Sequence, residues 1–461
     1  MTRVVTVAGG CFAPGHLGEL TRIVPFEMVD AVLAETGSVQ QRLRLLPSRV
    51  VVYLLLAAGL CAEIGLSQVW TRLCAGLTGL AVATPAPSAI TAARVRVGVA
   101  PLRALFDLLR GAETGCVRVG EGRAGRPGVF WRGRLVTAVD GSILCCADTA
   151  ANLTVFSKGG SSHGTSTGYP MVRVLALVAC GTRTIIDAVF GSDRTGEIGY
   201  AHQLLGSARA GMIVLADRNF AASTWIAALA ATRADLLVRV KNQRRLPVCK
   251  ILPDGSFLSR IGRVEVRVIT AQVTITTSEG CRTETYRLIT TVLDPHVPAL
   301  EIVALYHERW EIETGFAELK STSLGGRVLR SRTPTGVAQE IYALLITYQT
   351  LRIAISDATL DRSDIDPDRG SFTVALHAAR DQLIAAAGVI ADTVIDLVGT
   401  IGHHVLEQLL PARRVRTNPR VVKRAISKYV ASSAKGRHRG PNRPATTTID
   451  IQPILTTPPP T

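Results

Sequence analysis

The sequence predicts a mixed α/β fold preceded by a helical N-terminal domain, and three observations lead to this prediction. Residues 25–109 carry apolar side chains at three- and four-residue spacings, as helices do. Residues 135–241 change to short aliphatic runs separated by two helical stretches. Residues 242–285 alternate with a period of two, as in Val264, Val266 and Val268. We therefore expect helices first, then a mixed sheet, then a β-rich segment that interrupts this sheet.

The charge of the chain favours a polyanionic partner such as nucleic acid or anionic lipid. The 461 residues contain 52 Lys and Arg against 36 Asp and Glu, a net charge of +16. Residues 411–461 hold eleven of the basic residues and Asp450 as the only acid. The Pro, Thr and Arg content of the end predicts a basic, disordered tail over residues 412–461.

A membrane protein and a disulfide framework both fit the sequence poorly. The longest apolar stretch, Val50 to Ala62, is thirteen residues, whereas a bilayer requires about 20. The first 25 residues lack the layout of a secretion signal. Nine cysteines, an odd number without a CxxC pair, indicate a reducing compartment. We expect a cytoplasmic protein with a buried helix at Val50 to Ala62.

The expected N-terminal domain spans residues 1–111 and permits a DNA-binding motif. Ser88 is a candidate cap for a helix running to Arg96, Gly98 for a turn, and Pro101 for the start of a second helix through Leu109. The pair fits either a helix-turn-helix or an ordinary helical hairpin. Gly- and Arg-rich residues 112–133 are expected to form a linker.

The order of strands after the linker fits an RNase H-like topology. The segments LVTAVD, MVRVLALVAC and RTIIDAVF come first and are close enough to pair as antiparallel neighbours. GMIVLAD and DLLVRVK follow, alternating with helices near 195–207 and 220–231. We expect this core in two parts, residues 134–241 and 286–330, separated by the β-rich insertion 242–285. A strand YRLITTVL should lead into a long helix over 298–320, and residues 331–411 should form a C-terminal helical region.

Two of the predicted strands end on an aspartate, Asp140 and Asp217. Strand ends lie at the rim of an open sheet, where a carboxylate is accessible to a ligand. Aspartates also end strands simply because they cap the next helix, and Asp217 before RNFAAS fits that interpretation too. The pair alone therefore does not establish a site.

The helix expected over 298–320 supplies a third carboxylate. At 100° per residue, Tyr306, Arg309, Glu313 and Lys320 share one face. Glu308, Glu311 and Glu318 point to roughly the opposite side. The alternative is a solvated stripe of ion pairs, but that does not explain the two strand-end aspartates in a basic chain.

The segment YHERWEIETGFAELK reproduces the Y-x2-R-x3-E-x6-K signature of the insertion-element-four family of bacterial transposases, which the chain resembles over about residues 20–400. AVDGSILCCADTAAN is similar to the first-aspartate segment of that family and VLADRNF to the second. IVPFEMVDAVLAETG and RLRLLPSRVVVYLLLA resemble its N-terminal domain. One departure is Cys145-Cys146, where relatives usually carry less thiol-rich residues.

The resemblance implies a DDE transposase that acts by cut-and-paste transposition. Asp140, Asp217 and Glu313 would form the catalytic triad and bind two Mg²⁺ ions, with Mn²⁺ as a substitute, since hard carboxylate oxygens suit these ions. The expected partners are double-stranded DNA, both terminal inverted repeats and target, and a second copy of the chain in a homodimer on the bacterial nucleoid.

The resemblance also implies that Tyr306, Arg309 and Lys320 contact DNA phosphates. Trp310 is a candidate for stacking on a displaced base during hairpin cleavage, or for core packing. Arg239 and Lys241 either touch the DNA backbone or form a solvated strand end. His163 and the pair His403-His404 lack a matching cluster of ligands.

Two other functions remain open from the sequence. A metal-dependent nuclease or junction resolvase on the same fold would cut DNA without joining it. A catalytically inactive DNA-binding protein derived from a transposase would do neither.

Overall fold

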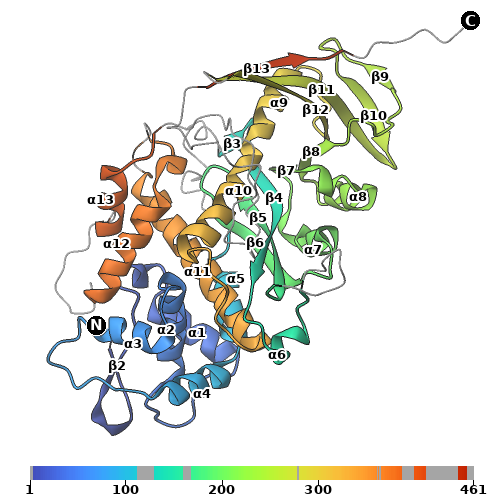
Figure 1. Cartoon of the computed structure of the whole chain (residues 1–461). Coiled ribbons are helices and arrows are strands. Elements are labelled where there is room, and N and C mark those ends of the chain that lie inside the picture. Colours follow the sequence, from blue (N-terminus) through green and yellow to red (C-terminus); the bar gives the residue numbers. More distant parts are fainter. Residues whose placement is uncertain are drawn as a thin grey trace, which may run out of the picture.

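The computed structural model describes residues 4–111, 129–158, 168–277, 280–360, 362, 365–386, 399–411 and 445–453. Figure 1 shows helices gathered at one end, a sheet in the middle and long twisted strands at the other end. Most of the expected linker, His163 and residues 412–444 of the expected tail lie outside the described residues. No described helix combines the length and the apolar composition needed to cross a membrane.

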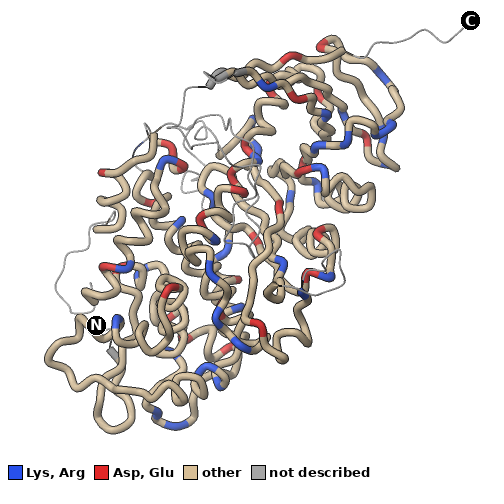
Figure 2. The backbone as a smooth tube through the Cα atoms, viewed as in Figure 1, with Lys and Arg blue, Asp and Glu red and all other residues tan. Residues whose placement is uncertain are grey.

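Charged residues are spread over all of these parts. Figure 2 shows Lys and Arg positions interleaved with Asp and Glu positions along most of the described chain. The eight cysteines among the described residues form no disulfide.

The helical end is built from segments at both ends of the sequence. The N-terminal helices are α1 (Phe26–Glu35), α2 (Ser48–Leu60), α3 (Leu66–Cys74), α4 (Pro87–Val97) and α5 (Ala100–Leu109). The C-terminal helices are α11 (Pro334–Ala358), α12 (Phe372–Ile384) and α13 (Gly399–Glu407). At Gly59 of α2, an added Cβ would lie only 2.8 Å from the carbonyl oxygen of Ala343. Glycine therefore permits a close crossing of α2 and α11.

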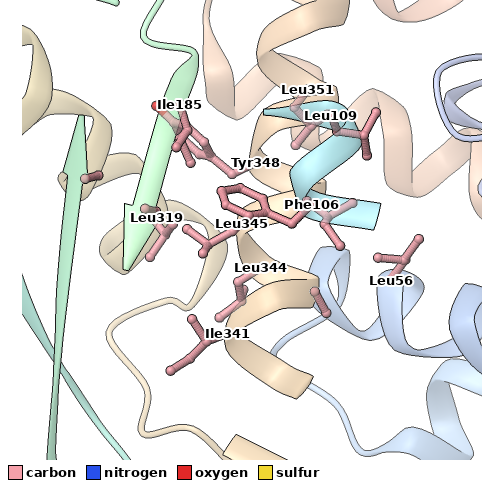
Figure 3. Close-up of a cluster of buried hydrophobic side chains, with 14 of the residues drawn as sticks. Leu56, Phe106, Leu109, Ile185, Leu319, Ile341, Leu344, Leu345, Tyr348 and Leu351 are labelled. Atoms are coloured by element: carbon pink, nitrogen blue, oxygen red, sulfur yellow. The ribbon is translucent and has the colours of Figure 1, made fainter. Parts of the chain in front are cut away.

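One hydrophobic core joins these helices to the sheet. Figure 3 shows Leu56 of α2, Phe106 and Leu109 of α5 and the α11 side chains Leu344, Leu345 and Tyr348 packed together. Ile185 and Leu319 reach the same cluster from a strand and from the helix after α10. The segments that the sequence suggested as two separate regions, 1–111 and 331–411, thus share a single core.

The N-terminal part differs from the expected helices in two details. A short hairpin, β1 (Val4–Thr6) and β2 (Phe12–Pro14), precedes them. Helices α4 and α5 form as expected around Gly98, but the N-cap of α4 is Ala86 and not Ser88, because Pro87 occupies the first helical position. Arg94 donates to Ser331 Oγ at 3.1 Å and Arg96 to the Leu46 carbonyl at 2.6 Å. Both arginines are engaged within the protein.

The central sheet contains all five strands that the sequence predicts for it. They are β4 (Arg134–Cys145), β5 (Met171–Ala179), β6 (Ile185–Ser192), β7 (Met212–Ala216) and β8 (Asp235–Val240). Their spatial order is β6-β5-β4-β7-β8, antiparallel from β6 to β4 and parallel from β4 to β8. The mixed α/β prediction is confirmed. A two-residue strand, β3 (Phe130–Trp131), lies within the expected linker and pairs with β4.

Helices cover both faces of this sheet. Alternate residues of β4 and β7 pack in different cores, Val136 and Ile213 on the side of α11, Leu135 and Val214 on the other. The second side carries α7 (Glu197–Gln203) and α8 (Ser223–Ala231), and α6 (Ala150–Leu153) follows β4. The first side carries α9 (Ala299–Tyr306) and α10 (Trp310–Ala317).

The β-rich segment extends the sheet instead of standing apart from it. Its strands are β9 (Lys250–Ile251), β10 (Phe257–Ile261), β11 (Val264–Thr277) and β12 (Gly280–Thr290). Residues 287–290 of β12 pair with β8, and the strand continues unbroken to Gly280. The expected boundary between residues 285 and 286 therefore falls inside one strand, β12.

The expected disorder of the tail is wrong for residues 445–451, which form β13 (Ala445–Ile451). This strand pairs with residues 271–277 of β11, along the edge that β10 occupies at residues 264–268. The sequence ATTTIDI is rich in β-branched residues, which favour strands, and β11 is longer than β10 and leaves this edge available. The prediction of disorder missed ATTTIDI because it was based on the composition of the whole tail.

We predict that Thr448→Pro separates β13 from β11. Thr448 pairs with Thr274, and proline cannot donate to the strand ladder. Hydrogen exchange of β11 should accelerate at residues 271–277 and stay unchanged at 264–268. Thr448→Val, which keeps the amide, is the control. Equal protection of β11 in both variants would show that β13 does not cover this edge in solution.

Candidate active site

Asp140 and Asp217 lie side by side on neighbouring strands. Val139 of β4 is in register with Ala216 of β7, so the aspartate that follows each occupies matching positions, about 4.8 Å apart across the sheet. Alternation along each strand directs both side chains to the face that carries α10, the face of Ala138 and Leu215. The structure thus brings the two aspartates together, but only Asp217 ends its strand. The expectation of a strand end is wrong for Asp140, because β4 pairs with β5 and continues to Cys145.

Glu313 approaches the same place from the helical segment over residues 299–323. This segment is less regular than the single helix expected, since a 3₁₀ turn at His307–Arg309 separates α9 from α10, and a π-helical turn at Glu318–Ser323 follows α10. π-Helical turns are uncommon and concentrate at functional sites. The expected direction of Glu311 and Glu318 is confirmed, because both side chains pair with Arg183, away from Glu313.

Three residues of the predicted stripe attach this segment to the strands that carry the aspartates. The Tyr306 hydroxyl donates to the carbonyl of Ala216, next to Asp217, at 3.3 Å. Arg309 lies 2.8 Å from Glu313 and 3.7 Å from Asp140. Lys320 Nζ donates to Ser142 Oγ, two residues beyond Asp140, at 3.2 Å. The stripe is an interface between helix and sheet, so the solvated alternative is excluded.

Burial and charge act strongly on these groups. Burial raises the pKa of Asp140 to about 7, against the Arg309 guanidinium, which lowers it; Asp217 and Glu313 raise it further. Burial alone would lower the pKa of Arg309, but Tyr306 and Glu313 hold it above its usual range. Burial raises the pKa of Tyr306 above its usual range, so the phenol stays neutral.

The same burial bears on the predicted DNA contacts of the stripe. Tyr306 is 5% exposed and Arg309 8%. Tyr306 is committed to the backbone of β7, which makes it a positioning residue in this structure. Arg309 and Lys320 keep the cationic groups that a phosphate would need, although each is engaged with a protein oxygen.

The three carboxylates fit the hard-oxygen donor set of a divalent metal ion. Within the described part of the chain, however, no three acidic, His or Cys side chains stand close enough to ligate one ion. The Arg309 guanidinium lies between two of the three carboxylates and neutralises part of their charge. The donors are suitable in kind, and Arg309 competes with a cation for Asp140 and Glu313.

The remaining predicted residues lie around this centre. Trp310 is partly exposed, with the Arg309 guanidinium 5.3 Å from its ring centroid. Arg239 pairs with Glu284 of β12 at 2.6 Å and stacks 4.1 Å from the Tyr286 ring. Lys241 is exposed and lines a cavity with Arg218, Gln243 and Arg244.

Sequence reasoning missed the buried ion pairs behind the helix. Arg183, in the turn between β5 and β6, contacts Glu311 at 2.6 Å and Glu318 at 3.0 Å. Arg352 of α11 is fully buried and also pairs with Glu318, and the Tyr348 hydroxyl donates to the same carboxylate. The only available signal was the presence of Glu311 and Glu318 on the face opposite Glu313.

Comparisons with known protein families agree with the geometry. Residues 14–107 match the family model described as the insertion element 4 transposase N-terminal, and residues 131–349 match the transposase DDE domain. The second match contains Asp140, Asp217 and Glu313. Together the two matches account for most of the chain.

Two proteins and one solved structure are similar to this chain. The chain is 26% identical over 427 residues to the transposase InsG for insertion sequence element IS4 of Escherichia coli, covering 89% of this chain and 93% of that protein. It is 30% identical over 138 residues to the putative transposase InsZ of the same organism, covering 29% of this chain and 42% of that one. Among solved structures, a piggyBac transposase synaptic complex with hairpin DNA matches with a TM-score of 0.42 and 9% identity, over 87% of this chain and 86% of that one.

We predict that Arg183→Met lowers the free energy of unfolding by about 3–5 kcal/mol, because it leaves two buried carboxylates with one cation fewer. Thermal or urea unfolding measures the loss. Arg132→Met, which removes a surface pair with Glu301, should lower the free energy of unfolding much less, because solvent screens exposed pairs. Adding Glu311→Gln to Arg183→Met should recover part of the loss, and a double variant no more stable than Arg183→Met would contradict the assignment.

Proposed function

Because the chain belongs to the insertion element 4 family of DDE transposases, we propose that it cuts the ends of its own insertion element and joins them to target DNA at Asp140, Asp217 and Glu313. The observation that carries the proposal is the convergence of these carboxylates. Asp140 and Asp217 follow paired residues of β4 and β7, and Arg309 bridges Asp140 to Glu313.

We assign the catalytic unit to an RNase H-like core formed by residues 134–241 and 286–330. The sheet order β6-β5-β4-β7-β8 and helices on both faces support this assignment. Residues 242–285, with the start of β12, form the insertion, residues 1–111 the N-terminal domain and 331–411 the C-terminal helical region. Residues 412–461 form the basic tail, with β13 returning to the insertion.

Asp140, Asp217 and Glu313 would hold the divalent cations of this family, two Mg²⁺ or Mn²⁺ ions per site. When bound, such ions lower the pKa of the attacking oxygen and neutralise charge on the leaving oxygen. Three carboxylates in a half-buried site repel one another, and this repulsion is part of what raises the pKa of Asp140. Bound cations would relieve this repulsion, and they would compete with Arg309 for the oxygens of Asp140 and Glu313.

The side chains around the carboxylates bind and position the scissile phosphate. Arg309 is the guanidinium nearest to the triad, and turning it from Asp140 to a DNA phosphate would exchange one anionic partner for another. Lys320, held over β4 by Ser142, places a second cation beside Asp140. Tyr306 fixes the helix to β7, so that Glu313 and Asp217 keep their separation.

One site can serve both chemical steps. Water attacks the phosphodiester first and releases a 3′-hydroxyl, and that hydroxyl then attacks a target phosphodiester; both are in-line displacements at phosphorus. Cleavage through a hairpin would require a displaced base, for which Trp310 beside Arg309 offers a partly exposed ring. Arg239 and Lys241 would contact the DNA backbone, and a homodimer would hold the two ends.

We predict that the purified protein with Mg²⁺ excises a DNA segment carrying its two terminal repeats and joins it to a second duplex. Sequencing the products should show element ends fused to new sites. Asp140→Asn, Asp217→Asn and Glu313→Gln should each abolish cleavage, at least about a thousandfold, while retaining DNA binding, because each removes a metal ligand.

Glu301→Gln is the matched control, since Glu301 lies on α9 and pairs with Arg132 at the surface. Glu311 is unsuitable as a control, because it is 2% exposed and paired with Arg183. Cleavage without joining by the wild-type protein would favour a nuclease, and near-normal cleavage by any triad variant would remove that residue from the triad.

We predict that neutralising the eleven Lys and Arg between residues 413 and 443 with Gln weakens non-specific DNA binding and flattens its salt dependence. Each cation that contacts a phosphate releases counterions, which sets the slope of affinity against salt. Retaining residues 445–453 keeps β13 paired with β11, so charge alone changes. Titration at several salt concentrations measures the slope, and an unchanged slope would show that these cations do not touch DNA.

A further inference from the structure

A cavity of about 400 Å³ is lined by Arg218, Ala221, Lys241, Gln243 and Arg244. Arg218 directly follows Asp217 in the turn after β7, and Lys241 directly follows β8. Strands β7 and β8 are parallel and adjacent, so their carboxyl ends open at the same edge of the sheet. Asp140 is on β4, Asp217 follows β7, and the cavity lies at the end of β8, the next strand in the sheet.

The charge of this cavity suits an anion. Three of its five lining residues are cations, and none of them is paired with a carboxylate among the residues that the structure describes. Figure 2 shows a group of Lys and Arg positions around β8, close to α8 and the first insertion strands. Arg218 and Lys241 are exposed, so their charges are available to a ligand from solvent.

The loop that forms the cavity is held in place before any ligand arrives. Arg244 donates to Ser223 Oγ at 3.1 Å and to the carbonyl of Ala221. Arg287 of β12 donates to the carbonyls of Asn242 and Arg244 at 3.0 and 2.7 Å. The Asp217 carboxylate accepts from the Asn219 amide and fixes the turn that carries Arg218. A prepared loop loses less entropy when a ligand binds.

We propose that this cavity is a binding site for a DNA backbone phosphate within a few nucleotides of the scissile one, with Arg218, Lys241 and Arg244 as its cations. Neighbouring strands are about 4.8 Å apart, so a site one strand beyond Asp217 lies roughly 10 Å from Asp140. Successive phosphates of one strand follow about every 3.4 Å of helix axis, so a DNA strand crossing the carboxylates reaches the cavity. The inference rests on the proposed function and adds a contact that fixes where the DNA strand runs.

The test is the double variant Arg218→Gln/Lys241→Gln, which removes two charges and spares Arg244, whose hydrogen bonds hold the loop. The matched control is Arg209→Gln/Arg233→Gln, which removes two exposed charges at the opposite ends of β7 and β8. Both pairs are placed in a Glu313→Gln background, and binding of a duplex carrying the terminal repeat is titrated against salt without metal. We expect the slope to fall by about one unit or more in the double variant and to stay unchanged in the control.

Two further arms, in the protein with Glu313 intact, identify which DNA supplies the phosphate. A slower cleavage of intact ends, about tenfold or more, assigns the phosphate to the element end. Normal cleavage with slower joining of pre-cut ends to a target duplex assigns it to target DNA. The proposal is overturned if the double variant and the control have the same salt slope, the same cleavage rate and the same joining rate. Failure of the wild-type protein to cleave at all would instead overturn the proposed function, because the salt slope is measured independently of cleavage.

Discussion

The position of Glu313 depends on a buried group of ion pairs on the far side of its helix. Glu318 receives Arg183, Arg352 and the Tyr348 hydroxyl, which come from the β5–β6 turn and from α11. On the opposite side the helix is attached to β4 and β7 through Arg309, Lys320 and Tyr306. The helix is therefore fixed against rotation from two directions, which sets Glu313 against the strands of Asp140 and Asp217.

Burying these charges costs free energy, which indicates that the ion pairs serve to position the helix. Arg352 is fully buried, Arg183 is 6% exposed, and Arg183 also adopts a φ of 58°, a conformation that L-residues seldom adopt. An apolar cluster of similar volume would often be as stable as such a network. Apolar packing alone allows a helix to slide or rotate, whereas paired charges match in one register. Arg183 contacts both Glu311 and Glu318. These two contacts restrict the start of the π-helical turn that carries Lys320.

The strands, the helices and the grouping of Asp140 with Asp217 followed from local patterns, because an aspartate after each aliphatic run and an i, i+3, i+7 stripe are visible in the sequence. The partners of Glu318 did not, since Arg183 and Arg352 lie far from it along the chain and ordinary surface arginines have the same local context. The burial of Tyr306 was equally hidden, because spacing shows which face Tyr306 shares but not what covers that face. β13 was hidden by the composition around it, and its formation depends on a free edge of β11.

Burial of the stripe has a consequence for how the chain meets DNA. Arg309 and Lys320 are already used to balance the carboxylates and to hold the helix, so the charge that first attracts a polyanion must come from elsewhere. In the proposed function, the exposed cations at the ends of β7 and β8 and the eleven basic residues after residue 412 would supply it. Attraction and chemistry are thus assigned to different residues. Such a division permits tight, salt-dependent binding while the carboxylate site stays small, half-buried and electrostatically balanced until a phosphate arrives.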